Sequence, residues 1–166
     1  TLAYAASEGD VCTVANDNDP SQVVISGHKA AIDRAVALAK EHGFKRGILL
    51  PVSAPFHCPL MQPAADAMAD ALAATPPGAP LVPVFANVTA AAVSEPEAIA
   101  RLLVEQVTGR VRWRESVAAM EEAGVTHFIE FGGKVLGPMV KRSAAGEVEA
   151  TSVITMDDVE ALAKSL

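Results

Sequence analysis

Apolar and polar positions repeat along the chain with two different periods, which predict strands alternating with helices. Short runs rich in β-branched residues favour strands, and longer segments with apolar residues every three to four positions favour helices. Strands are predicted at residues 11–16, 22–26, 45–50, 81–87, 126–131 and 151–154. Helices are predicted at residues 29–42, 59–74, 94–106, 113–123, 134–142 and 157–165, with residues 1–7 as the end of another. This alternation is typical of α/β architecture.

Local signals set several of these bounds. Turn-forming residues at 17–21 separate the first two strands and predict a hairpin. Gly43 follows the helix at 29–42, and Pro59 suits the first turn of the next helix. Ser94 and Glu97 have the spacing of a capping box, which predicts a helix start at Ser94.

The order of the first elements predicts a small subdomain at residues 1–51. Strand, strand, helix and strand are what remains of a split β-α-β, ferredoxin-like lobe whose first strand is missing. Because residues 1–7 look like the tail of a helix with nothing before it, the chain is expected to start inside a fold. Residues 52–166 are then expected to form a second unit.

Composition narrows the class of protein. A chain of 166 residues with 51% hydrophobic and 20% charged residues is expected to bury a core. The net charge of −7 argues against nucleic acid as a partner. There is no apolar run of membrane-spanning length and no basic leader before an apolar run, so a cytoplasmic protein without a membrane partner is expected. Cys12 and Cys58 lack metal or redox spacing and are expected to be reduced thiols.

Residues 50–61, Leu-Pro-Val-Ser-Ala-Pro-Phe-His-Cys-Pro-Leu-Met, are the strongest candidate for chemistry. Pro51, Pro55 and Pro59 restrict the backbone and are expected to hold His57 on a stiff, extended loop. A histidine held in this way suits proton transfer near neutral pH. A lone loop histidine is also compatible with a structural role, and the loop alone leaves both interpretations open.

The other candidate groups have simpler explanations. His28 starts a helix, His42 precedes a helix-ending glycine, and His127 leads into a strand. Cys58 follows His57, but neighbours in an extended loop point to opposite sides, so this pair is not expected to share a proton. The chain has no G-x-S-x-G elbow, Walker loop, H-E-x-x-H or paired cysteines, so no self-contained hydrolase, nucleotidase or metal site is expected.

Several segments together carry a family resemblance. They are residues 15–27, Ala-Asn-Asp-Asn-Asp-Pro-Ser-Gln-Val-Val-Ile-Ser-Gly, then 50–61, 85–88, 105–113 and 128–136. In order and spacing they closely resemble malonyl-CoA:acyl carrier protein transacylases, over essentially the whole chain. The resemblance implies that residues 52–166 are the C-terminal part of an α/β-hydrolase-like acyltransferase core. It also implies that the serine nucleophile, the oxyanion loop and the malonyl-binding arginine lie upstream, so this segment alone is expected to be inactive.

The resemblance implies a ping-pong mechanism. A serine takes the malonyl group from coenzyme A and passes it to the phosphopantetheine thiol of acyl carrier protein. His57 matches the family's general base and acid, and Gln106 matches the residue whose backbone carbonyl orients that ring. No cofactor is implied, because the coenzyme A thioester is itself the substrate.

Further residues match the substrate entrance of the family. Phe56 is similar to the residue that malonyl-selective relatives have before the histidine. Packing in the core would explain an aromatic side chain there equally well. Candidate coenzyme A contacts are Asn16, Asn18, Gln22 and Arg46. The two asparagines are also typical turn formers, and both interpretations stay open.

Basic residues gather between Arg101 and Arg142, and either solvated helix faces or a surface for an acidic partner would explain them. Lys134, Lys141 and Arg142 are the candidates for docking acyl carrier protein.

Three hypotheses for the function of the chain stay open: a segment of a stand-alone transacylase, an acyltransferase segment of a polyketide synthase, or a non-catalytic carrier-binding fragment. The end of the chain after a short acidic helix favours the first, and an exposed sheet edge prone to aggregation disfavours the third.

Overall fold

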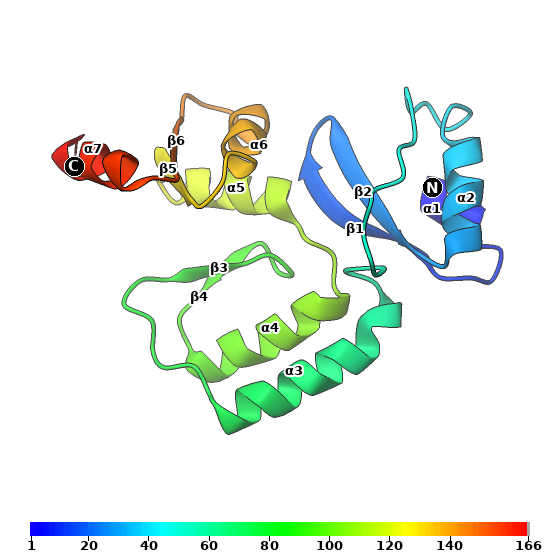
Figure 1. Cartoon of the computed structure of the whole chain (residues 1–166), viewed down its shortest axis with the longest axis horizontal. Coiled ribbons are helices and arrows are strands. Elements are labelled where there is room, and N and C mark those ends of the chain that lie inside the picture. The colour runs from blue at the N-terminus through cyan, green and yellow to red at the C-terminus, as the bar shows by residue number, and fades with distance from the viewer. Residues whose placement is uncertain (166) are drawn as a thin grey trace.

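The computed structural model describes residues 1–165, within which three two-stranded sheets lie among helices (Figure 1). The helices are α1 Leu2–Ser7, α2 Lys29–Leu38, the 3-10 helix η1 Pro59–Met61, α3 Gln62–Ala74, α4 Pro96–Thr108, α5 Trp113–Glu122, α6 Leu136–Ser143 and α7 Met156–Ser165. The strands are β1 Cys12–Asp19, β2 Gln22–Gly27, β3 Val84–Ala86, β4 Ala91–Val93, β5 His127–Phe131 and β6 Glu149–Val153. The predicted α/β class is confirmed.

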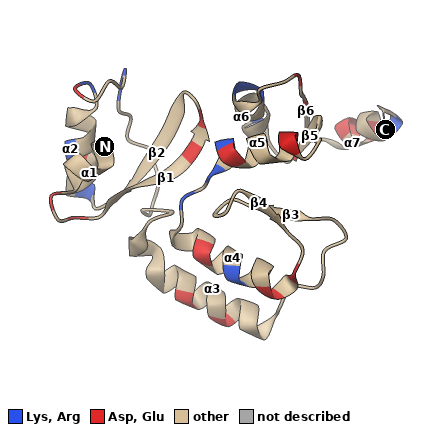
Figure 2. Ribbon diagram, turned by 180° about the vertical axis from the view of Figure 1, so that it is seen from behind, with Lys and Arg blue, Asp and Glu red and all other residues tan. Residues whose placement is uncertain are grey.

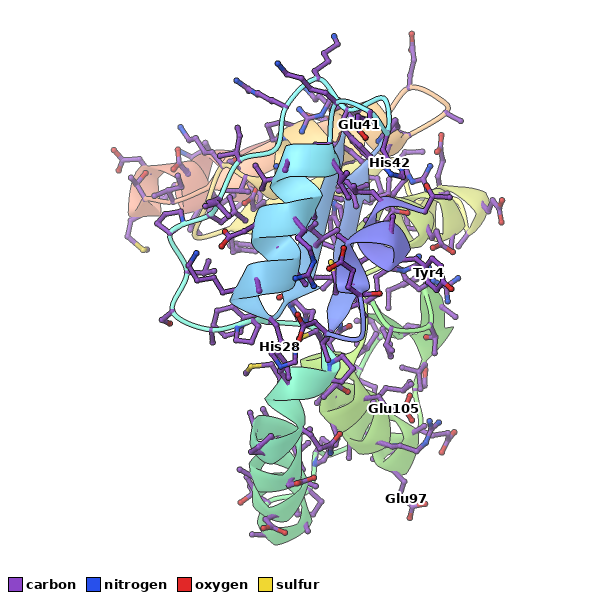
Figure 3. All side chains as sticks on the ribbon, turned by 90° about the vertical axis from the view of Figure 1, so that its right-hand side faces the viewer. Tyr4, His28, Glu41, His42, Glu97 and Glu105 are labelled. Atoms are coloured by element: carbon purple, nitrogen blue, oxygen red, sulfur yellow. The ribbon has the colours of Figure 1, made fainter. Side chains whose placement is uncertain are left out.

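The N-terminal lobe consists of α1, α2 and the antiparallel β1–β2 hairpin. Its core contains small side chains, Ala6, Cys12, Ala31 and Ala35, which allow α1 and α2 to pack closely against the hairpin. Figure 3 shows this lobe from the side, with His28 and His42 at opposite ends of α2 and Tyr4 on α1. The tip of the hairpin points toward α5 and α6 (Figure 1).

The predicted strand at residues 45–50 is wrong. This segment has no strand partner among the described residues, and Ile48, Leu49 and Leu50 are exposed. Gly47 lies instead against α2, where an added Cβ would be 3.2 Å from the Cα of Val36. Apolar periodicity alone could not reveal this, because a strand forms only where a neighbouring strand accepts and donates its backbone hydrogen bonds. The preceding helix also ends at Leu38 rather than at residue 42.

The middle of the chain forms a short β3–β4 hairpin and the helix pair α3 and α4, which lie side by side (Figure 1). The predicted strand at 81–87 shortens to Val84–Ala86, and β4 was not predicted. The predicted capping box at Ser94 is also wrong, because α4 begins after Glu95 without a side-chain cap. A capping box forms instead at α7, where Thr155 and Asp158 each accept a hydrogen bond from the other's backbone amide.

The C-terminal part contains a parallel pair, β5 and β6, joined through α6. Val117, Val140 and Val153 are buried in this part of the chain. The Glu130 carboxylate, at the end of β5, accepts the amides of residues 135–137, so α6 begins at Leu136 rather than at residue 134. These amide hydrogen bonds, chiefly that of Gly137, lower the pKa of Glu130.

Candidate active site

His57 lies in the loop before η1 and contacts the last turn of α4. Its Nδ1 is 2.9 Å from the backbone carbonyl oxygen of Gln106. The last carbonyls of a helix have no partner within the helix, so this oxygen is free to accept. Because a carbonyl can only accept, the proton must be on Nδ1, and Nε2 is left with a lone pair. The contact predicted from the sequence is therefore present, and its geometry leaves Nε2 able to act as a base.

The backbone at His57 differs from the sequence prediction. Its φ is 58°, in the left-handed region, whereas the prolines led us to expect an extended chain. Cys58 next to it is extended and fully buried, and its thiol donates to the Pro55 carbonyl oxygen at 3.1 Å. The left-handed turn thus directs the imidazole to α4 while the thiol packs into the loop. Glu8 and Ala90 also have positive φ, so this backbone conformation is compatible with a functional position but does not by itself indicate one.

The end of α4 that holds His57 is tightly packed. The Gln106 side chain donates from Nε2 to the Gly109 carbonyl oxygen at 3.0 Å. A Cβ at Gly109 would lie 2.7 Å from the Glu105 carbonyl oxygen and 2.9 Å from a methyl group of Val88. The helix can therefore end closely against its neighbours only because residue 109 is glycine.

The candidate substrate-binding residues lie on the β1–β2 hairpin and in the loop between α2 and η1. Asn16 and Asn18 are half-buried on β1, and Gln22 is exposed at the start of β2. Arg46 lies in the exposed loop after α2, and Phe56 is 46% exposed beside His57. Among residues 1–165, no hydrogen bond joins any of these side chains to His57. The roles assigned to them from the sequence stay predictions.

Most basic residues after residue 100 are paired with acidic residues within the fold. Arg101, Arg110, Arg112, Arg114 and Arg142 all form ion pairs with carboxylates. Lys134 and Lys141 are exposed and line an open hollow of about 340 Å³ next to α6. These two lysines are called the candidate docking surface, and their role in docking stays a prediction. The third predicted docking residue, Arg142, is already paired, because its guanidinium contacts Asp19 at 2.7 Å.

Sequence reasoning missed two buried aspartates in the hairpin. Asp17 and Asp19 were taken only as turn formers, yet they are 7% and 1% exposed. Burial alternates along β1, with Ala15, Asp17 and Asp19 on the buried positions. That two-residue period was visible in the sequence, but carboxylates on the inward face become plausible only once arginines are known to meet them.

The remaining titratable groups fit structural roles. His28 accepts the Val11 amide at 2.9 Å, and the Nε2 of His127 lies 2.8 Å from the Thr151 hydroxyl. Burial raises the pKa of the Cys12 thiol, with Arg34 opposing it, so this thiol is a poor nucleophile.

Within residues 1–165 no three His, Cys, Asp or Glu side chains gather as metal ligands would. In the same part of the chain, each helix is too short or too polar to cross a bilayer.

Comparison with known proteins shows the family of the chain. Residues 3–150 match the family described as acyl transferase domain. The chain belongs to this family. The malonyl CoA-acyl carrier protein transacylase of Escherichia coli (strain K12) is 43% identical over 162 residues, which are 97% of this chain and 51% of that protein.

Solved structures of acyl transferases show the same fold. The acyl-carrier-protein-S-malonyltransferase of Bartonella henselae superposes with a TM-score of 0.92 at 45% identity, over 99% of this chain and 52% of that one. A malonyl-transacylase solved in complex with its type II PKS acyl-carrier protein has a TM-score of 0.93 at 36% identity, over 99% and 53% of the two chains. This acyl transferase chain therefore spans about half the length of the relatives it matches.

Proposed function

We propose that this chain supplies the histidine half of a malonyl-CoA:acyl carrier protein transacylase, as its C-terminal part. The observation that carries the proposal is the hydrogen bond of 2.9 Å between His57 Nδ1 and the Gln106 carbonyl oxygen, in an acyl transferase fold. A neutral carbonyl fixes the imidazole tautomer without placing a second charge in the site. The names of the relatives support malonyl-CoA and acyl carrier protein as the two substrates.

The proposed chemistry proceeds in two balanced halves. His57 Nε2 takes the proton of a serine hydroxyl, the serine oxygen bonds to the malonyl carbonyl carbon, and the carbon–sulfur bond breaks. The imidazolium then returns the proton to the coenzyme A thiolate. In the second half, His57 deprotonates the carrier thiol, whose sulfur displaces the serine oxygen, and the proton returns to the serine. Acyl transfer of this kind is redox neutral, so it requires no oxidant or reductant.

The remaining contacts are assigned by position. We infer that Asn16, Asn18, Gln22 and Arg46 contact coenzyme A and that Phe56 borders the acyl group. The candidate docking surface, Lys134 before α6 and Lys141 on it, would meet an acidic carrier protein by charge complementarity. The likeness to a transacylase of a type II PKS acyl-carrier protein makes a polyketide carrier the second candidate partner.

The test is malonyl transfer by the full-length protein. Radiolabelled malonyl-CoA and carrier protein bearing phosphopantetheine are supplied, and labelled carrier is counted. His57→Ala should reduce the rate about 10²-fold to 10⁴-fold, as expected for loss of a general base. His42→Ala is the matched control, because this exposed histidine lies at the far end of α2 (Figure 3). Full activity of His57→Ala would refute the assignment, and transfer by residues 1–166 alone would refute the requirement for a second half.

A further inference from the structure

The tip of the β1–β2 hairpin is anchored to two helices of the C-terminal part through its two buried aspartates. Arg114, on α5, donates from Nε and Nη2 to the two carboxylate oxygens of Asp17, at 3.1 and 2.7 Å. Arg142, on α6, donates from the same two nitrogens to Asp19 Oδ2, at 3.0 and 2.7 Å. We call these two ion pairs the hairpin anchors. Figure 2 shows the acidic positions of β1 beside the basic start of α5.

The hairpin needs such support because its pairing is irregular. The register shifts between Val14 and Asn16 and again between Asp17 and Asp19. A two-stranded ribbon is marginally stable by itself, and irregular pairing bends it locally. Contacts with two separate helices therefore decide where its tip lies.

Both carboxylate oxygens of Asp19 accept hydrogen bonds, each from a different residue. Its Oδ1 accepts the backbone amide and the hydroxyl of Ser21, at 2.8 and 2.6 Å, which closes the hairpin turn. Its Oδ2 accepts only Arg142. One oxygen thus shapes the turn and the other fixes the position of the turn on α6.

The same strand is joined by its backbone to the segment that carries the histidine's partner. Val111 donates to the Ala15 carbonyl oxygen and accepts from the Asp17 amide, both at 2.8 Å. Val111 follows α4, whose last turn presents the Gln106 carbonyl to His57. The backbone of residues 106–111 therefore contacts both the hairpin and the His57 imidazole.

The two faces of β1 have different neighbours. The aspartates lie on buried positions, and Asn16 and Asn18 lie on the half-buried positions that alternate with them. We propose that Asp17 and Asp19 are positioning residues. The hairpin anchors hold β1 at a fixed position relative to His57 and thereby set the affinity for coenzyme A. This inference rests on the proposed function, in which the hairpin contacts the coenzyme A part of the thioester.

The test compares two thioesters in the full-length protein. Asp19→Asn keeps an oxygen for Ser21 but presents an amide group to Arg142, so the anchor is lost and the turn is kept. Asp33→Asn is the matched control, because it removes a carboxylate from an exposed pair with Lys29 on α2. The substrates are malonyl-CoA and malonyl-N-acetylcysteamine, a short thioester that lacks the nucleotide.

Loss of the anchor should raise KM for malonyl-CoA about tenfold and change kcat by less than about twofold, as expected for lost binding alone. The short thioester should react as it does with the wild type. Arg142→Gln should have the same effect, and the double variant should be no worse than either single one. If Asp19→Asn does not fold, Arg142→Lys replaces it, because lysine keeps the charge and loses the planar two-nitrogen contact.

Two results would overturn the inference. One is an unchanged KM for malonyl-CoA in folded Asp19→Asn and Arg142→Gln. The other is an equal loss with both thioesters, which would mean that the anchors only hold the fold together. A wild-type protein that transfers malonyl from neither thioester would refute the proposed function itself, and this inference with it.

Discussion

Acid should weaken the attachment of the β1–β2 hairpin to α6, because this attachment depends on ionised Asp19. Burial disfavours the charge, but hydrogen bonds from Arg142 and Ser21 outweigh it and hold the pKa of Asp19 at about 2, below the usual 3.8. A pKa that is lower in the folded state means that ionisation favours folding. The contribution is therefore complete well above pH 3.8 and is lost as the pH falls toward 2.

The size of the effect follows from the same shift. A pKa that falls from 3.8 to about 2 on folding corresponds to about 2 kcal/mol of stability near neutral pH. The Asp19 side chain has no exposed surface but that of Arg142 is 47% exposed, so solvent screens the pair in part and about 2 kcal/mol is an upper value. Asp19→Asn should therefore lower the free energy of unfolding by at most about 2 kcal/mol near pH 7.

The measurement is urea unfolding of the full-length protein and of Asp19→Asn, near pH 7, 5 and 3. The gap between the two free energies should stay constant from about pH 7 to 5 and fall to about half near pH 3. Asp33→Asn should cost less than about 1 kcal/mol, because its pair with Lys29 is exposed. A gap for Asp19→Asn that is the same at all three pH values would refute the role given to its charge.

Three further substitutions test other parts of the structure. Gly27→Ala should cost about 3 kcal/mol or more in urea unfolding, because its Cβ would lie 1.9 Å from the Val11 carbonyl oxygen, whereas Gly78→Ala, in open space, should be tolerated. His57→Gly should be more stable to urea than His57→Ala by about 1 kcal/mol, because only glycine is unstrained at a φ of 58°, and both should lose malonyl transfer to the same extent; equal stability would argue against backbone strain there. Exchange of both lysines of the candidate docking surface for glutamate should raise KM for carrier protein at low salt and leave KM for malonyl-CoA unchanged, and an effect that persists at high salt would contradict docking by charge.

Most elements can be identified as helix or strand, and placed approximately, from the amino-acid sequence alone. The helices α4, α5 and α7 and the strands β5 and β6 follow from apolar periods that each segment carries within itself. The ordered motifs around His57 and Gln106 were likewise visible in the sequence, and the contact between these two residues is present in the structure. These features depend on local pattern or on residue identity, so one sequence suffices to predict them.

Features that depend on a partner distant in sequence are visible only in the folded chain. Residues 45–50 have the composition of a strand, but the fold gives them no neighbour to pair with. The left-handed turn at His57 is selected where the imidazole meets α4, and residue propensity would not predict it. Arg142 looked like a docking residue and Asp19 like a turn former, yet they meet across 123 positions of sequence. Which charges face solvent and which are buried against each other is determined by packing, because a charge enters the interior only where the fold brings it an opposite partner.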